Sequence, residues 1–415
     1  MSNNSISLNS LRIDADRLSR RIDELARIGA LEGGGVCRLA LTDDDRKGRD
    51  LVCRWMQELG LEITVDRIGN VVGIRKGEEQ GDPVMTGSHI DTVATGGPYD
   101  GNLGVLAGLE VVQTLNDAGI STKHPIAVAF FTNEEGARFA PDMMGSGVHQ
   151  GALDLDEMLA VEGIDRKTVN DQLSAIGYAG ETAVGGFRAH SYVELHIEQG
   201  PVLEQEDVLV GAVTGVQGIS WTEYTISGTS NHAGTTPMQF RHDPGYVAAQ
   251  ISVEIRRLAA EIGNGQVGTV GQINLNPNLI NVIPRQAVIT VDLRNIDEAL
   301  LQQAEMKLQT YIDDIATAEG VQIESRTLAR FEPVAFDPEM ISLVEQTAQS
   351  LGFSCMQMPS GAGHDAQMFA PNCPTSMIFV PSEGGVSHNV REHTEPEQLA
   401  AGANVLLQVM LHRSA

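Results

Sequence analysis

Residues 83–132 read PVMTGSHIDTVATGGPYDGNLGVLAGLEVVQTLNDAGISTKHPIAVAFFT, and the pattern of this stretch decides the fold class. The apolar residues at 83–89 predict a strand, and those at 104–115 have the spacing of a helix. Residues 125–132 form a nearly continuous apolar run, which is typical of a strand buried on both faces. Strands that alternate with helices predict an α/β fold with a mostly parallel sheet, and chemistry is expected where its strands end.

The middle of the chain has a different pattern. Its elements follow the order βαββαβ, which is typical of a small ferredoxin-like α+β domain. They are predicted as a strand at 219–228, a helix at 244–262, strands at 267–275 and 286–294, a helix at 297–319 and a strand at 321–330. After these elements the first pattern returns. The sequence therefore predicts one α/β domain in two pieces, 1–213 and 331–415, with a smaller domain, 214–330, inserted between them.

The composition argues against several classes of protein. The 415 residues contain 28 Lys and Arg against 55 Asp and Glu, a formal net charge of −27. Such a surface repels nucleic acid and anionic lipid, so we expect neither as a partner. The apolar runs are far shorter than the ~20 residues of a membrane-spanning helix. Because the first residues lack a signal-peptide core and the 4 cysteines are far apart, we expect a cytoplasmic protein with buried free thiols.

Side chains that commonly bind metal ions are concentrated in a few short stretches, most of them at predicted strand ends. They are His89 and Asp91 in GSHIDTV, Asp100 in GPYDGNLG, Glu134 and Glu135 in FTNEEGARF, His196 in HIEQG and His388 in VSHNV. Taken alone, a Glu pair is usually solvated and a single His is usually structural. This Glu pair, however, directly follows the apolar run AVAFF, and crowded carboxylates need a cation to offset their repulsion. We therefore expect a metal site assembled by the folded sheet.

From end to end, the chain resembles the amidase/hydantoinase/carbamoylase branch of the di-metal M20 peptidase superfamily. The motifs that carry the resemblance are GSHIDTV, YDGNLGVLAGLEV, TNEEGARF, MMGSGV, HIEQGP, NHAGTTPM, NLINVIP, DLRN, GAGHDA and SHN. His196 favours this branch, because peptidase members commonly carry a carboxylate there. The resemblance implies hydrolysis of the carbamoyl C–N bond of N-carbamoyl-L-amino acids to the amino acid, CO2 and ammonia.

The resemblance also implies two divalent metal ions per subunit, which the ligand types allow to be Zn²⁺, Mn²⁺ or Co²⁺. The implied metal ligands are Asp100 as the bridge between the ions, His89 and His196 on one ion, and Glu135 and His388 on the other. Glu134 would be the general base that activates water, and Asp91 would orient His89.

Further residues are implied to surround the substrate. His232, from the inserted domain, would donate to the developing oxyanion, and Gln199 would line the pocket. Asn281 and Arg294 would hold a substrate carboxylate, for which a bidentate Arg is well suited. The resemblance also implies a role for His364 and Asp365 in GAGHDA, either in contact with the metal ligands or as part of the substrate pocket.

The motifs leave the substrate and the assembly open. Allantoate amidohydrolases and β-ureidopropionases share the same motifs. A non-catalytic, metal-stabilised binding protein would lack a ligand or the base, whereas all of these positions are filled here. The resemblance implies a homodimer formed by the inserted domain, with His232 reaching the partner's active site. The simpler alternative is that this domain is a lid for its own subunit.

Overall fold

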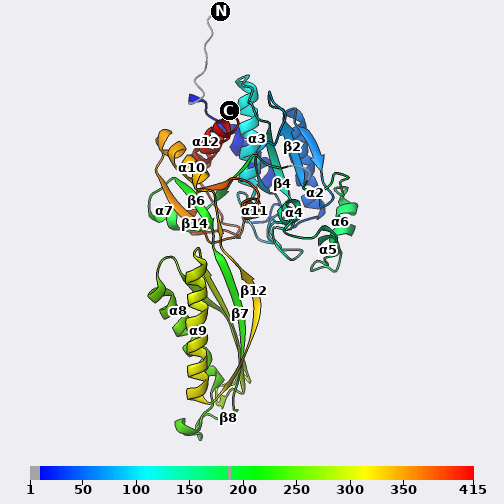
Figure 1. Ribbon diagram of the computed structural model, residues 1–415. Coiled ribbons are helices and arrows are strands. Elements are labelled where there is room, and N and C mark those ends of the chain that lie inside the picture. Colours follow the sequence, from blue (N-terminus) through cyan, green and yellow to red (C-terminus); the bar gives the residue numbers. More distant parts are fainter. Residues whose placement is uncertain (1–9, 186–187) are drawn as a thin grey trace, which may run out of the picture. The chain divides into compact units, whose positions relative to one another are not determined.

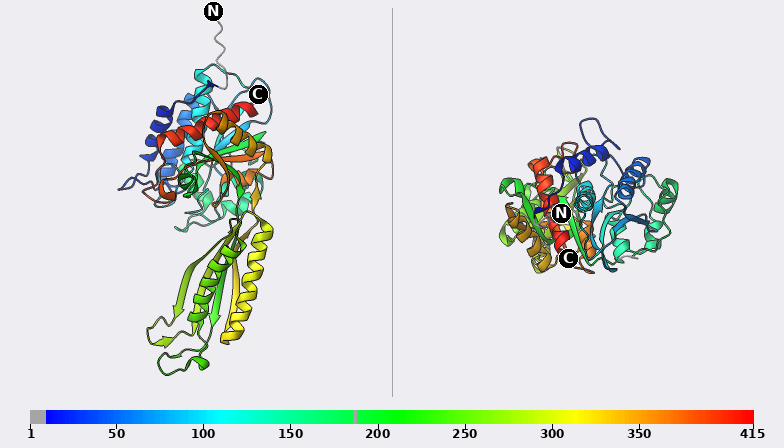
Figure 2. Two further views of the ribbon diagram at one scale, coloured as in Figure 1. Left: turned by 90° about the vertical axis from the view of Figure 1, so that its left-hand side faces the viewer. Right: turned by 90° about the horizontal axis from the view of Figure 1, so that it is seen from above.

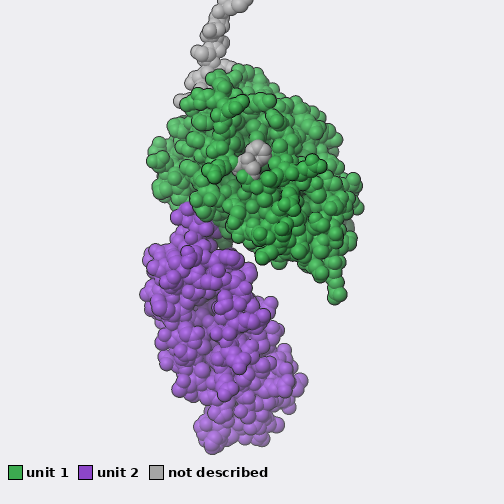
Figure 3. Space-filling model, turned by 45° about the vertical axis from the view of Figure 1, so that its right-hand side comes forward, with its two compact units in different colours: residues 1–214, 336–415 green, residues 215–335 purple. Residues whose placement is uncertain are grey.

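The computed structural model describes residues 10–185 and 188–415. Its contacts divide the chain into two compact units, one of residues 1–214 and 336–415 and the other of residues 215–335 (Figure 3). The second unit is therefore an insertion in the first. Its end lies a few residues after the predicted boundary at 330, because Val334 and Ala335 pair with Val216 and Gly215.

A large mixed sheet forms the centre of the first unit, with the strand order β1-β2-β4-β3-β5-β15-β6 and with β14 paired to β6; β6 also pairs with the two-residue strand β13, which is the last segment of the second unit. The strands are β1 (Glu62–Val65), β2 (Val71–Arg75), β3 (Val84–His89), β4 (Ile126–Phe131), β5 (Ser191–Ile197), β6 (Val210–Val216), β13 (Val334–Ala335), β14 (Cys355–Ser360) and β15 (Thr375–Val380). The central strands β4, β3, β5 and β15 are parallel to one another and buried along their whole length. The outer pairs are antiparallel. The predicted α/β class is confirmed, with the parallel pairing concentrated at the centre of the sheet.

Helices cover this sheet. They are α1 (Ala15–Ala26), α2 (Asp43–Glu58), α3 (Asn102–Asp117), α4 (Met144–Gln150), α5 (Leu155–Leu159), α6 (Val169–Ile176), α7 (Val202–Gln205), α10 (Pro338–Ser350), α11 (Asp365–Phe369) and α12 (Pro396–Arg413). The C-terminal α12, red in Figure 2, packs against α3, α10 and β15. No helix within the described residues is long and apolar enough to cross a membrane.

Helix α3 lies unusually close to the central strands, because glycines face them. A Cβ atom at Gly104 would lie 2.6 Å from the Leu195 carbonyl oxygen, and one at Gly108 would lie 2.8 Å from Thr86 Cγ2. Only glycine allows this approach. The close packing fixes the position of the loop that precedes α3, and this loop carries Asp100.

The second unit has a four-stranded antiparallel sheet in the order β12-β7-β11-β9, with helices α8 and α9 on one face (Figure 1). Its elements are β7 (Gly218–Ser227), α8 (Pro244–Ile262), β9 (Val267–Asn276), β11 (Gln286–Asn295), α9 (Glu298–Glu319) and β12 (Gln322–Phe331). Alternate residues of β11 are buried, so one face of the sheet packs on the helices. The predicted βαββαβ order is present. Two additional short strands, β8 (Asn231–His232) between β7 and α8 and β10 (Val282–Ile283) between β9 and β11, pair with each other in an antiparallel ladder.

The structure differs from the sequence-based expectations at the cysteines and in elements that the sequence pattern does not predict, which include β6, β14 and α12. The cysteines are free thiols, as expected, but Cys37, Cys53, Cys355 and Cys373 are half-buried rather than buried. Helix α12 was not predicted, because ten of its residues are buried and apolar side chains surround it on most sides. A helix enclosed in this way lacks the amphipathic period that reveals a surface helix.

Candidate active site

The parallel central strands bring predicted site residues to one edge of the sheet. His89 is the last residue of β3, His196 is the penultimate residue of β5, and Glu135 follows the end of β4. Parallel strands end on the same side, so these side chains meet although the chain separates them widely. Asp100 enters from the loop before α3, and His388 enters from the loop between β15 and α12.

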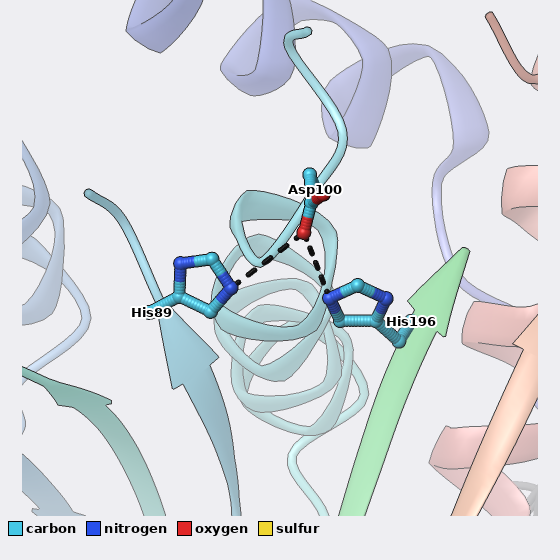
Figure 4. Close-up of side chains that lie close together, drawn as sticks. All are labelled: His89, Asp100 and His196. Atoms are coloured by element: carbon cyan, nitrogen blue, oxygen red, sulfur yellow. Dashed lines mark ion pairs between the residues drawn. The ribbon is translucent and has the colours of Figure 1, made fainter. Parts of the chain in front are cut away.

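Asp100 lies at the centre of this cluster. Its Oδ1 atom is 3.6 Å from His89 Nε2 and 3.1 Å from His196 Nε2 (Figure 4). Its Oδ2 atom is 3.3 Å from His388 Nε2, and Glu135 Oε2 is 3.3 Å from the same nitrogen. Asp100 is therefore shared by two groups whose donor atoms lie within 4.8 Å of one another, one with His89 and His196 and the other with Glu135 and His388.

The histidine rings are held so that Nε2 faces Asp100. The Nδ1 atom of His89 lies 2.9 Å from the carbonyl oxygen of Asp91, and that of His196 lies 2.8 Å from the carbonyl oxygen of Ile197. A carbonyl at Nδ1 fixes the proton there and leaves Nε2 as the donor atom for a metal ion. This arrangement is the one that a metal-ligating histidine needs.

The Asp91 side chain has a different contact from the one expected. Its main-chain carbonyl, not its carboxylate, contacts His89. The carboxylate instead accepts the N–H groups of Glu134 and Glu135, each at 3.3 Å. The reason is that the side chain reaches the end of the neighbouring strand β4. Asp91 therefore holds the loop that carries the two glutamates.

The charges of the cluster fit a bound cation. Asp100 is 3% and Glu134 7% exposed. Burial raises the pKa of Glu134 well above its usual range, and burial together with Asp100 raises the pKa of Glu135 to about 7. Burial alone would raise the pKa of Asp100 too, but hydrogen bonds from three histidines hold it well below its usual range. Glu135 Oε1 is buried and has no hydrogen-bond partner among the described residues. Crowded buried carboxylates with an unpartnered oxygen are what a dication compensates.

A third group, Glu194, His196 and His364, also brings donor atoms together. Its atoms already have protein partners: Ser88 Oγ and the Ala366 N–H donate to Glu194 at 2.7 and 2.8 Å. His364 Nε2 lies 2.9 Å from Ser360 Oγ. We therefore regard this group as support for His196, since the rings of His196 and His364 lie 4.6 Å apart. Sequence reasoning missed Glu194, although its spacing of two from His196 on a strand places both on one face.

A cavity of about 110 Å³ opens at the cluster. Its lining includes the five candidate ligands and Glu134, together with Gln199 and His364. Gln199 Nε2 donates to Asp100 Oδ2 at 2.8 Å. Asp365 directly follows the cavity residue His364 in the sequence and is fully buried. The cavity is small compared with the ~300–1,000 Å³ of typical ligand sites. A ligand that fills a typical site would therefore also have to contact residues outside this cavity.

The remaining predicted residues lie in the second unit. His232 is exposed in β8, and its Nδ1 atom accepts the N–H groups of Gly234 and Thr235 at 3.0 and 3.2 Å. An Nδ1 that accepts must be unprotonated, so a neutral ring carries its proton on Nε2. The Ala233 N–H donates to the Asn281 carbonyl at 3.0 Å, which brings Asn281 beside His232.

Arg294 lies elsewhere in that unit. It is near the end of β11, where it pairs in register with Ile219 and Val267. Its guanidinium makes an ion pair with Asp292 at 2.9 Å and lies 5.7 Å from the centre of the Trp221 ring. Within one copy of this unit, the structure thus brings His232 and Asn281 together but places Arg294 at the opposite end of the sheet.

Comparison with known proteins identifies the family. The model for peptidase family M20/M25/M40 matches residues 85–412, and the chain belongs to this family. An N-carbamoyl-L-amino-acid amidohydrolase from Rhizobium meliloti is 44% identical over 401 residues, 96% of each chain. A protein of the same name from Geobacillus stearothermophilus is 40% identical over 95% of this chain and 97% of its own. The crystal structure of an amidase of the hydantoinase/carbamoylase family from Burkholderia multivorans is 46% identical, with a TM-score of 0.96 over 98% of this chain and 99% of that one.

Metal uptake by the metal-free protein is expected to release protons and to strengthen as the pH rises. A hydrogen bond with Asp100 raises the pKa of His388 to about 9, and burial raises that of Glu135 to about 7. At neutral pH, His388 is therefore protonated and Glu135 partly so, and a cation must displace both protons. Calorimetric titration in two buffers of different ionisation enthalpy measures the released protons. Affinity that stays constant between pH 7 and 9, without proton release, would contradict the assignment of these two ligands.

Proposed function

We propose that the protein is a metal-dependent amidohydrolase that cleaves the carbamoyl C–N bond of N-carbamoyl-L-amino acids, releasing the amino acid, CO2 and ammonia. The observation that carries the proposal is the single buried carboxylate, Asp100, shared by two groups of metal-binding side chains. Glu134 lies beside them but belongs to neither group. The names and the nearly full-length similarity of the relatives support the choice of substrate class.

In this proposal five side chains would hold two divalent ions. His89 and His196 would hold one ion, Glu135 and His388 would hold the other, and Asp100, which belongs to both groups, would contribute to each. The mixed nitrogen and oxygen donor set suits Zn²⁺, Mn²⁺ or Co²⁺. When bound, such ions polarise a carbonyl oxygen and make water a better nucleophile, which suits the poorly electrophilic carbamoyl carbon.

Glu134 is the proton carrier in the proposal. Its Oε2 atom lies 3.3 Å from His89 Nε2, and its side chain lines the cavity. From this position the carboxylate can take a proton from the attacking water. The same group then delivers the proton to the leaving nitrogen.

His232 stabilises the oxygen that gains negative charge. Since its Nδ1 atom accepts two main-chain N–H groups, its Nε2–H is the group available as a donor. A positioned donor of this kind is most valuable where charge develops in the transition state. Asn281 lies beside it and is proposed to bind the substrate carboxylate together with Arg294.

The layout of the second unit supports a homodimer. From Gln286, next to the β8–β10 ladder, to Arg294 is eight residues of continuous strand, or ~26 Å at about 3.3 Å per residue. One N-carbamoyl amino acid cannot span that length. His232 and Asn281 of one copy therefore act with Arg294 of another, which a two-fold dimer provides. Strand β9 forms an edge of the sheet, and exposed apolar side chains on it and on α8, Ile273 at 49% and Val253 at 65%, offer a surface for pairing.

Replacing Arg294 with Met is expected to raise KM strongly for substrates with a carboxylate and much less for the matching neutral amides. The physical reason is the loss of a charge-assisted contact to the carboxylate. Arg330→Met is the matched control, because Arg330 is a similarly exposed arginine of the same unit that is ion-paired with Glu298 and Glu305. An equal rise in KM for acid and amide would show that Arg294 is structural.

The function is tested by combining metal analysis with a substrate panel of N-carbamoyl-L-amino acids, allantoate and 3-ureidopropionate. The proposal expects two bound ions per chain and ammonia release that is fastest with N-carbamoyl-L-amino acids. Faster turnover of allantoate or 3-ureidopropionate would reassign the substrate within the same chemistry. A protein that binds metal but turns over none of these compounds would be a binding protein, and the proposal would be wrong.

A further inference from the structure

A buried carboxylate that belongs to neither ligand group lies next to Asp100. Glu392 is 4% exposed, and its Oε1 atom accepts the main-chain N–H groups of Tyr99 and Asp100 at 3.0 and 3.1 Å. The approach is close enough that a Cβ atom at Gly97 would collide with the Glu392 side chain. Glu392 therefore holds the backbone of the loop that presents Asp100.

Ser387 connects the same carboxylate to the side chain of Asp100. Its Oγ atom lies 2.9 Å from Asp100 Oδ2 and 3.0 Å from Glu392 Oε2. A hydroxyl has one proton, so it donates to one of these oxygens at a time. Asp100 is thus held at its backbone directly by Glu392 and at its side chain through Ser387.

The contacts join two loops that each carry a candidate metal ligand. Asp100 lies on one loop, whereas His388 lies between Ser387 and Glu392 on the other. The Glu392 N–H donates to the Asn389 carbonyl at 3.0 Å, a turn that keeps Glu392 close to His388. Since the two loops are nearly 300 residues apart in the sequence, their relative position depends on contacts of this kind.

We propose that Glu392 is a positioning residue that sets the geometry of the metal centre by holding Asp100 through its backbone and through Ser387. The inference rests on the proposed metal centre. Groups that orient metal ligands commonly change metal affinity by 10–100-fold when they are removed, although they touch no ion themselves. The readout is therefore metal affinity of the full-length, metal-free protein, measured calorimetrically with Mn²⁺ as the probe.

Glu392→Ala is expected to bind at least one Mn²⁺ ion about 10–100-fold more weakly than the unmodified protein. Glu392→Gln keeps an acceptor for the Tyr99 and Asp100 N–H groups, so its affinity should stay close to that of the unmodified protein. Asp66→Ala is the matched control. Asp66 is 7% exposed and accepts the N–H groups of Ile68 and Asn70 at 3.1 and 2.9 Å. Its loss should lower Tm without changing metal affinity.

Unchanged Mn²⁺ affinity in Glu392→Ala, with only a lower Tm, would overturn the inference and leave the metal centre intact. If Glu392→Ala does not fold, Ser387→Ala carries the test, because it removes only a hydroxyl and must also weaken binding. Unchanged affinity in that variant would again overturn the inference. An unmodified protein that binds no Mn²⁺, Zn²⁺ or Co²⁺ would instead overturn the proposed centre and this inference together.

Discussion

Glu134→Gln is expected to lose activity by ~10²-fold or more while it keeps its bound metal ions. The substitution preserves the shape of the side chain but removes its ability to take a proton from water. Glu134 shares no ligand group with Asp100, so the metal content should not change. The measurements are kcat on the best carbamoyl substrate and metal content by elemental analysis.

The neighbouring residue provides the contrast. Glu135→Gln alters a candidate ligand 3.3 Å from His388 Nε2, so it should lose metal as well as activity. The two glutamates are adjacent in sequence and both line the cavity, so a loss of metal in only one of the two variants would distinguish their roles. Turnover near that of the unmodified protein in Glu134→Gln would rule out Glu134 as the base.

A mixture of two inactive variants, Glu134→Ala and His232→Ala, is expected to regain about a quarter of the activity of the unmodified protein. In a mixed dimer, one site combines the intact Glu134 of one chain with the intact His232 of the other. Random reassortment makes half of the dimers mixed, and each mixed dimer has one working site of two. The measurement is activity after subunit exchange, with exchange followed by differently tagged chains.

The control mixture pairs Glu134→Ala with His89→Ala. Both residues line the same cavity of the first unit, so no mixed dimer contains a complete site. This mixture should stay inactive under every model. If the Glu134→Ala and His232→Ala mixture also stays inactive after confirmed exchange, His232 serves its own chain and the shared site is wrong.

Much of the fold could be predicted because the signals are local. The buried strand β4 is a continuous apolar run, and the second unit shows the alternation of β11 and the helical period of α8 and α9. The antiparallel pairing of the outer strands was not predictable, because the residue pattern of a strand indicates neither its neighbour in the sheet nor the direction of that neighbour. Helix α12 was missed for a related reason, since its surroundings rather than its own period determine its burial.

The candidate metal ligands could also be named from the sequence, because each lies in a short motif and most follow a strand. His89, Glu135 and His196 are of this kind. Ser387 and Glu392 could not be found in the same way. A single acid or hydroxyl carries no local signal, and its importance comes only from the atoms that the folded chain places around it.

The sequence by itself determined which residues are available for chemistry and where the strands and helices with a clear apolar period lie, since both follow from side-chain type and spacing along the chain. Only the tertiary structure decided that Asp100 lies between two ligand groups and that Glu392 holds its loop. It also decided that the Nε2–H group of His232 is available as a donor, and that His232 and Arg294 lie near opposite ends of the four-stranded sheet. These facts depend on distances between atoms far apart in the chain, and such distances are set by the packing of strands and helices rather than by the order of residues.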